Sequence, residues 1–232
     1  MDATRLIVII AAREEADRIA ATVEGVRGAF PGAHVIVADD GSRDGTAQVA
    51  AGAGAEVVRL DRPAGKGGAA GRAAQRALER DPELVLLCDA DLAASAGRLA
   101  PLLEAVDRGE ADLAVAVFAR RVGGGFGFAV GFARWAIRNL TGLELRAPIS
   151  GQRALRPEVL AAVTPFAPRF GMEIGMTVDA VRAGYRVHEV EVDLEHRATG
   201  RTWRGFAHRL RQLKDFVLVW ASRRLRTSRP VA

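Results

Sequence analysis

Short apolar runs of strand length recur through the first half of the chain, and each is bounded by turn residues. Apolar residues fill consecutive positions in these runs, which is typical of strands buried on both faces of a parallel sheet. We expect five such strands, at residues 6–11, 34–38, 55–60, 84–88 and 113–118.

The segments between these runs have the apolar spacing of amphipathic helices. The clearest apolar face consists of Ile19, Val23, Val26 and Phe30. Further segments have helical length and spacing, at residues 46–53, 68–78 and 99–106. Asp44 precedes the predicted helix at 46–53 and Ser95 precedes the one at 99–106, so both are possible N-cap residues.

This alternation predicts an α/β fold in which helices cover both faces of a mostly parallel sheet. In open sheets of this kind, ligands bind beyond the carboxyl ends of the strands. The residues that follow each strand are therefore the first candidates for a functional site.

After residue 118 the pattern predicts the rest of a domain and then a tail. Residues 123–127 are mostly glycine, and we expect a mobile loop over the site there. Later elements are expected at residues 128–140 (an aromatic helix), 151–155, from 157 onward (a helix), 172–183 (a helix) and 186–194 (a strand). The chain thus divides into a domain of residues 1–204 and a basic helical tail of residues 205–232.

The apolar spacing in the tail predicts an amphipathic helix over residues 205–222. Its apolar side consists of Phe206, Leu210, Leu213, Phe216, Val217 and Trp220. Residues 197–232 hold nine Arg and one Lys against the single Asp215, a net charge of +9 that leaves −4 for the rest of the chain. Such a helix either lies on an anionic membrane surface or packs back on the sheet, and both alternatives stay open.

The composition narrows the class of protein. With 232 residues, 49% of them hydrophobic and 26% charged, the chain suits one compact domain and no fibrous or disordered class. No run approaches the roughly 20 apolar residues of a membrane span, and no signal peptide is visible. The single cysteine, Cys88, lies in an apolar run, so we expect a core residue and a cytoplasmic protein, with the inner face of the plasma membrane as the place where its tail would bind.

Acidic residues follow three of the predicted strands. Asp39 and Asp40 follow the second, Asp89 and Asp91 the fourth, and Glu15 lies shortly after the first. Two aspartates separated by one residue point to the same side of an extended chain, and their hard oxygens favour Mg²⁺ or Mn²⁺. A nucleotide sugar needs such a cation, because its diphosphate departs with additional negative charge.

Several segments in order resemble the signatures of family 2 glycosyltransferases, which have the GT-A fold. They are Asp39-Asp-Gly-Ser-Arg-Asp-Gly-Thr46, Gly65-Lys-Gly-Gly-Ala-Ala-Gly-Arg72, Asp89-Ala-Asp91, Ser150-Gly-Gln-Arg-Ala154, Phe170-Gly-Met-Glu-Ile174, Arg182-Ala-Gly-Tyr-Arg-Val187 and His196-Arg-Ala-Thr-Gly200. Their order is similar to that of the dolichyl- and polyprenyl-phosphate mannosyl- or glucosyltransferase branch. The resemblance covers roughly residues 5 to 204.

The resemblance implies a metal-dependent transfer from a donor of the UDP-glucose or GDP-mannose type. It implies donor contacts from Ala12, Glu15, Asp39, Asp40, Lys66, Arg72, Asp89 and Ala90. Asp89 and Asp91 would hold Mg²⁺ or Mn²⁺, with His196 as a further ligand or an exposed residue without a role. Asp91 and Glu173 are the candidate catalytic residues, although Glu173 would also suit the start of a helix.

The branch further implies a polyprenyl phosphate acceptor, whose phosphate would be held by guanidinium groups. The matching positions are Arg120, Arg121, Arg134, Gln152, Arg153, Arg197 and Arg201. A phosphate acceptor is ionised near neutral pH and needs no strong base, whereas a hydroxyl acceptor does.

Departures from the family pattern concern mainly the acceptor. Ala147 replaces an aspartate, and Gly200-Arg-Thr-Trp203 lacks an expected lysine, for which Arg201 or Arg204 would substitute. A soluble acceptor, such as a phosphorylated small acid or a glycoside, therefore stays as an alternative. A nucleic-acid-binding protein is disfavoured, because aromatic residues make up only 6% and no base-reading module is visible.

Overall fold

A computed structural model gives the structure of residues 5–118, 127–194 and 203–226. Within these residues, seven strands form one sheet in the order β3-β2-β1-β4-β6-β5-β7. The strands are β1 (Leu6–Ala12), β2 (His34–Asp39), β3 (Glu56–Arg59), β4 (Leu84–Asp89), β5 (Leu113–Phe118), β6 (Arg153–Leu155) and β7 (Val187–Val192). The predicted α/β class and the positions of the apolar strands are confirmed.

The sheet is mostly parallel, as the strand and helix alternation predicted. β3, β2, β1 and β4 pair in parallel, and so do β5 and β7. β6 runs antiparallel between β4 and β5. The segment that leads into β6 therefore arrives at the end of the sheet where β4 finishes.

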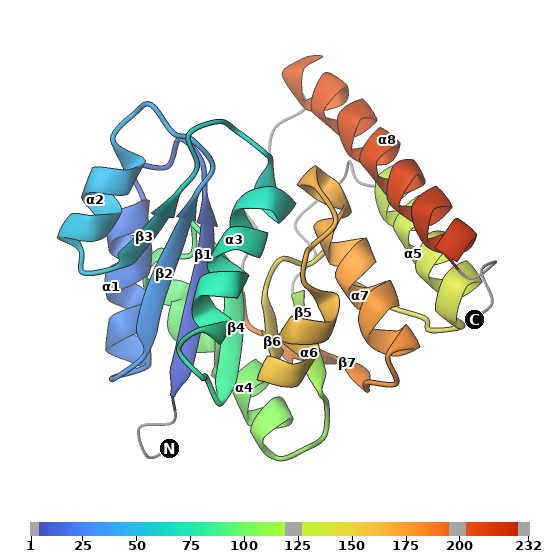
Figure 1. Cartoon of the computed structure of the whole chain (residues 1–232), viewed down its shortest axis with the longest axis horizontal. Helices are drawn as coiled ribbons and strands as arrows, with labels where there is room; N and C mark the ends of the chain where they lie inside the picture. Colours follow the sequence, from blue (N-terminus) through green and yellow to red (C-terminus); the bar gives the residue numbers. More distant parts are fainter. Residues whose placement is uncertain (1–4, 119–126, 195–202, 227–232) are drawn as a thin grey trace.

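Helices cover both faces of the sheet (Figure 1). They are α1 (Ile19–Ala29), α2 (Thr46–Gly52), α3 (Lys66–Leu78), α4 (Ala100–Asp107), α5 (Gly127–Thr141), α6 (Pro157–Val163), α7 (Met172–Arg182) and α8 (Trp203–Arg226), with 3-10 turns η1 (Ala93–Leu99) and η2 (Arg169–Gly171). Alternate residues of β1 point to opposite faces: Val8 and Ile10 pack towards α1 and α4, and Ile7 and Ile9 towards α3, α6 and α7.

The predicted helix caps differ from those observed. Asp44 does accept hydrogen bonds from the Thr46 backbone N–H and hydroxyl, but the N-cap residue of α2 is Gly45. Ser95 is not an N-cap, because it lies inside η1, which runs directly into α4, and its hydroxyl donates to the Leu92 carbonyl. Because η1 leads directly into α4, carbonyl groups of η1 precede the first N–H groups of α4, and no side-chain cap is needed there.

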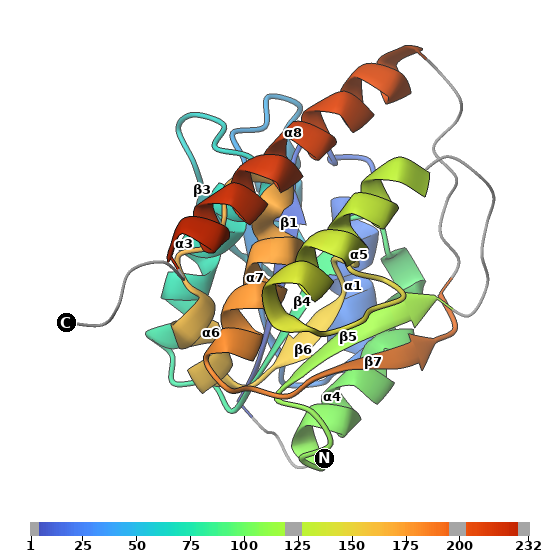
Figure 2. The same cartoon turned by 90° about the vertical axis from the view of Figure 1, so that its right-hand side faces the viewer.

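The C-terminal helix α8 packs back on the domain, against α5, α7 and η2 rather than on the sheet (Figure 2). Phe216 and Val219 are buried in a third apolar cluster with residues of α5 and α7. Val217, predicted on the apolar side, is instead 40% exposed. The division of the chain at residue 204 stays a prediction.

None of the helices in the described part of the chain is both long enough and apolar enough to span a bilayer. Of the glycine-rich segment 123–127, for which a loop over the site was expected, residues 123–126 lie outside the described residues, and Gly127 is the first residue of α5.

Candidate functional site

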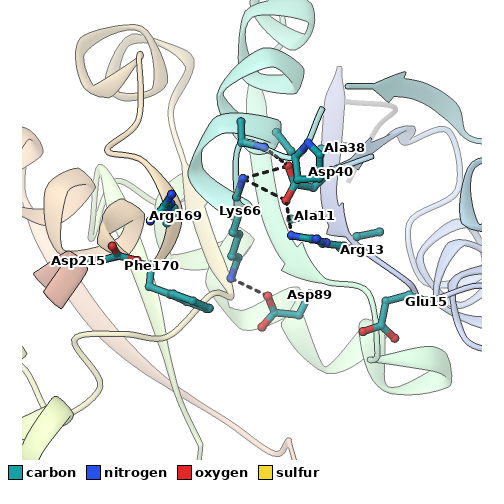
Figure 3. Close-up of a pocket in the computed structure, with 15 residues that line it drawn as sticks. Ala11, Arg13, Glu15, Ala38, Asp40, Lys66, Asp89, Arg169, Phe170 and Asp215 are labelled. Carbon is teal, nitrogen blue, oxygen red and sulfur yellow. Dashed lines mark hydrogen bonds and ion pairs between the residues drawn. The ribbon is translucent and has the colours of Figure 1, made fainter. Parts of the chain in front are cut away.

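A cavity of about 750 Å³ opens at the carboxyl ends of β1, β2 and β4. Its wall combines residues that follow these strands with the start of α3, with η2 and with Asp215 of α8 (Figure 3). The site therefore lies where a parallel sheet of this kind binds its ligands.

Asp40 connects the end of β2 to the loop before α3. Its buried carboxylate accepts hydrogen bonds from the backbone N–H groups of Ala64 (2.7 Å) and Gly65 (3.0 Å). An Arg13 guanidinium nitrogen lies 3.5 Å from the other carboxylate oxygen. These contacts fix one wall of the cavity and leave Asp40 lining it.

Asp39, by contrast, is wholly buried and does not line the cavity. One carboxylate oxygen accepts hydrogen bonds from the Ser42 backbone N–H and hydroxyl, which holds the turn that Gly41 makes with φ 70°. Arg59 lies 3.4 Å from the other oxygen, which has no hydrogen bond within the described residues. The contact of Asp39 with a nucleoside stays a prediction.

Lys66 occupies the centre of the site. Its ammonium lies 2.7 Å from a carboxylate oxygen of Asp89 and 2.9 Å from one of Glu173. The side-chain amide of Gln152 donates to the second oxygen of Asp89 at 2.8 Å. Burial alone would lower the pKa of Lys66, but the two carboxylates outweigh it and raise the pKa above its usual value, so the ammonium stays charged. The site thus joins residues from four elements. Lys66 lies at the start of α3 and Glu173 in the first turn of α7, while Asp89 ends β4 and Gln152 directly precedes β6.

Asp89 and Asp91 are the candidate metal ligands. The Asp89 side chain is 35% exposed and lines the cavity, and Asp91, two residues later, is exposed. Burial raises the pKa of Glu15; the positive charge of Arg18 opposes this, and the negative charge of Asp91 raises the pKa further, so Asp91 lies within electrostatic range of cavity-lining Glu15.

The donor set fits Mg²⁺ or Mn²⁺. Within the described residues no group of three or more His, Cys, Asp or Glu side chains surrounds a common point. Magnesium is commonly bound by one or two carboxylates together with substrate phosphates and water, so the aspartate pair is sufficient.

The remaining predicted donor residues lie in three different environments. Ala12 lines the cavity. Ala90 is buried, and its carbonyl accepts a hydrogen bond from the Thr22 hydroxyl at 2.6 Å. Arg72 is exposed on α3 and donates to Gln75 at 3.3 Å, outside the cavity. Its donor contact stays a prediction.

The predicted acceptor residues are not brought together within the described part of the chain. Arg153 is wholly buried, and its guanidinium donates to Ser150, Pro148 and Thr177, while burial lowers its pKa to about 10. Arg134 is exposed on α5 and donates to the Arg146 carbonyl. The acceptor candidates Arg120, Arg121, Arg197 and Arg201 lie outside the described residues, and so does His196, the predicted further metal ligand.

The cavity also contains residues to which the sequence assigned no role. The charged and aromatic ones are Arg13, Arg169, Phe170 and Asp215. Arg169 has a φ of 55°, the left-handed conformation that non-glycine residues rarely adopt. Sequence spacing gives no signal for Asp215, because only the path of α8 brings it to the cavity.

The family model described as glycosyl transferase family 2 matches residues 7–162. An undecaprenyl-phosphate mannosyltransferase of Micrococcus luteus is 31% identical, over 85% of this chain and 86% of that protein. A polyprenol monophosphomannose synthase of Mycolicibacterium smegmatis is also 31% identical, over 84% of this chain and 79% of that protein.

A solved structure has the same architecture. The glucosyl-3-phosphoglycerate synthase of Mycobacterium tuberculosis, crystallised with Mn²⁺, uridine diphosphate and glucosyl-3-phosphoglycerate, superposes with a TM-score of 0.74 at 25% identity, covering 95% of this chain and 80% of that one. The same enzyme has also been crystallised with Mg²⁺ and uridine diphosphate. On these matches and on the order of its motifs, the chain belongs to glycosyl transferase family 2.

Proposed function

We propose that this protein transfers a hexose from a nucleotide sugar to a polyprenyl phosphate. The observation that supports it best is the meeting of Asp40, Lys66 and Asp89 at one cavity beyond the sheet, with Glu173 paired to Lys66 behind it. The two curated relatives carry names that describe transfer to polyprenyl phosphates.

The cavity offers separate environments for the parts of a donor. Arg13, Glu15 and Asp40 supply donors and acceptors for the base and ribose. The Lys66 ammonium, backed by two carboxylates, supplies positive charge for the diphosphate. A Mg²⁺ or Mn²⁺ ion held by Asp89 and Asp91 would neutralise the diphosphate as it leaves.

In the transfer, an acceptor oxygen forms a bond to the anomeric carbon while the bond from that carbon to the β-phosphate oxygen breaks. The nucleoside diphosphate leaves with the electron pair of that bond, and inversion at the carbon is the expected outcome. Glu173 is 6% exposed and paired with Lys66. We assign it to orienting Lys66, because a phosphate acceptor arrives already ionised and needs no base.

The surface beside the cavity suits a lipid-borne acceptor. Leu218 and Leu225 of α8 are 56% and 71% exposed, and helical geometry places them about 60° and 80° around the helix from cavity-lining Asp215. On α5, Phe128 and Trp135 are 94% and 48% exposed. Exposed apolar side chains flanked by arginines are typical of proteins that rest on an anionic membrane, so we propose peripheral binding through this α5–α8 surface.

A soluble phosphorylated acceptor is the second candidate. It is favoured by the fold shared with the glucosyl-3-phosphoglycerate synthase, whose crystals hold its phosphorylated product. The same cavity would then bind a phosphorylated acid in place of a lipid phosphate.

A transfer assay separates the two candidates. The full chain is incubated with Mn²⁺ and labelled GDP-mannose or UDP-glucose, and with either undecaprenyl phosphate in anionic vesicles or 3-phosphoglycerate. We expect label in the solvent-extracted lipid only in the first arm. Label in phosphoglycerate with none in lipid would replace the main proposal by the second.

An Asp91→Asn variant tests the metal assignment. Loss of the carboxylate should remove the gain in nucleotide-sugar affinity that Mn²⁺ gives the wild type, measured by calorimetry. Equal Mn²⁺ dependence in both proteins would show that Asp91 is not a ligand.

A further inference from the structure

Asp215 is a buried acid that faces the donor cavity from outside the sheet. It is 7% exposed and lines the cavity, and within the described residues it forms no hydrogen bond or ion pair. A buried carboxylate without a partner is costly, and such groups in native proteins usually await a ligand or water.

The carboxylate is open to the cavity rather than sealed in the core. Within the described residues, the one fully enclosed side-chain oxygen without a hydrogen bond is that of Asp39, so the Asp215 oxygens retain some accessible surface. Because Asp215 lines the cavity, that surface is available to a bound molecule.

The position of Asp215 is fixed by the packing of α8. The neighbouring residues Phe216 and Val219 are 1% and 4% exposed. Val219 lies so close to Gly171 of η2 that a Cβ there would be 2.1 Å from its methyl carbon. Further along α8, Arg223 pairs with Asp179 of α7 at 2.7 Å. Asp215 is therefore held in place before any ligand binds, as a recognition residue requires.

The surroundings of Asp215 indicate what it would bind. Figure 3 shows Asp215 with Arg169 and Phe170 on the side of Lys66 away from Glu15. A carboxylate repels phosphate and accepts hydrogen bonds from hydroxyl groups. The neighbouring Phe170 ring offers an apolar surface of the kind on which the C–H face of a sugar packs.

We propose that Asp215 accepts hydrogen bonds from hydroxyl groups of the hexose of the donor, and so determines which sugar is bound. The inference rests on the donor half of the proposed function, in which the nucleoside lies near Asp40 and the diphosphate near Lys66. It makes α8 part of the donor site as well as of the outer surface.

Binding measurements without any acceptor test this inference. Asp215→Ala and Asp215→Asn are compared with wild type for affinity to UDP-glucose and GDP-mannose, and to UDP and GDP, all with Mn²⁺. For whichever nucleotide sugar binds, we expect Asp215→Ala to weaken binding by about tenfold or more, because hydrogen bonds to a charged group are lost. Affinity for the matching nucleoside diphosphate should change less than about twofold, since it lacks the hexose.

The control is Asp107→Asn, which removes an equal charge from an exposed position at the end of α4, away from the cavity. Thermal unfolding of Asp215→Asn should match or exceed that of wild type, because an unpaired buried charge is removed. Equal losses for nucleotide sugar and nucleoside diphosphate, unchanged binding of both, or a clear loss of stability in Asp215→Asn would each overturn the proposal. Since no acceptor is present, these outcomes are independent of whether a polyprenyl phosphate is the substrate.

Discussion

Gly151 shows how closely single residues are constrained around Lys66. A Cβ at this position would lie 2.6 Å from the Lys66 ammonium and 2.8 Å from both oxygens of Asp89. Flexible side-chain ends can move, so Gly151→Ala should fold with stability near that of wild type while separating Lys66 from Asp89. We expect donor affinity in Mn²⁺ to fall about tenfold in calorimetry.

The matched control for this substitution is Gly28→Ala, on an exposed part of α1 where an added Cβ meets nothing. It should leave donor affinity unchanged and gain about 0.5–1 kcal/mol in unfolding free energy. If Gly151→Ala binds the donor with wild-type affinity, a Cβ at residue 151 does not separate Lys66 from Asp89.

Cys88 gives a second prediction for a single residue. It is 3% exposed beneath the site, and burial raises the pKa of its thiol well above the usual value. The reactive thiolate is therefore absent near neutral pH. A thiol reagent should label the native protein very slowly and the guanidinium-denatured protein rapidly; rapid labelling of both would contradict the burial.

Residue types at the strand ends could be predicted from the sequence, but not which side chains reach the cavity. Arg72 lies six positions after Lys66, about 120° away around α3, so the two cannot face the same space. Arg153 and Leu155 share one face of β6, and that face is buried against the core. The motif that contains Gln152 and Arg153 thus supplies one residue to the site and one to the interior.

Among the elements, β3 pairs with β2 in the sheet, and one β3 carboxylate adds side-chain contacts to its neighbours. Glu56 bonds His34 of β2 at 2.6 Å, Arg76 of α3 at 2.6 Å and Arg80, which follows α3, at 2.5 Å. Burial of Glu56 opposes ionisation, but the hydrogen bonds from Arg76, His34 and Arg80 prevail and lower its pKa from 4.5 to about 2.

Because this folded-state pKa is lowered, the contribution to stability is present above the unfolded pKa near 4.5 and is lost as the pH falls towards 2. We expect Glu56→Gln to lose about 1–2 kcal/mol in denaturant unfolding at neutral pH and much less near pH 3. This is below the full pKa shift because Arg76 and Arg80 are 44% and 37% exposed and screened by solvent. Glu79→Gln, at a 61% exposed partner of Arg76, is the control and should change little at either pH.

The docking of α8 depends on a glycine in a different element. Gly171→Ala would bring its new methyl group to 2.1 Å from Val219, whose β-branched side chain has little freedom in a helix. We expect a loss of about 1–3 kcal/mol in unfolding free energy, and partial recovery when Val219→Ala is added. Additive losses in the double variant would show that this contact does not position α8.

Element positions followed the sequence closely because apolar periodicity is a local property. The five strands of the first half, the helix after Pro157 and the start of α7 lie where the pattern predicted them. The position of α8 could not be predicted in this way, since the same apolar side suits a membrane surface or a protein core. Tertiary contacts with α5 and α7 decide it.

At the scale of the whole molecule, the α5–α8 surface predicts binding to anionic vesicles. Leu218→Ser with Leu225→Ser removes apolar area from exposed positions and leaves the buried side of α8 intact. We expect co-sedimentation with phosphatidylglycerol vesicles to fall about tenfold, and wild type to bind phosphatidylcholine vesicles more weakly. Unchanged sedimentation of the double variant would remove the α8 part of the membrane proposal.

A single helix, α8, carries both Asp215 and the exposed Leu218 and Leu225. Under the proposed membrane binding, a variant meant to stay in solution would therefore carry substitutions at Leu218 and Leu225 and keep the rest of α8. Deleting α8 would also take Asp215 out of the cavity wall, where we propose that it binds the hexose.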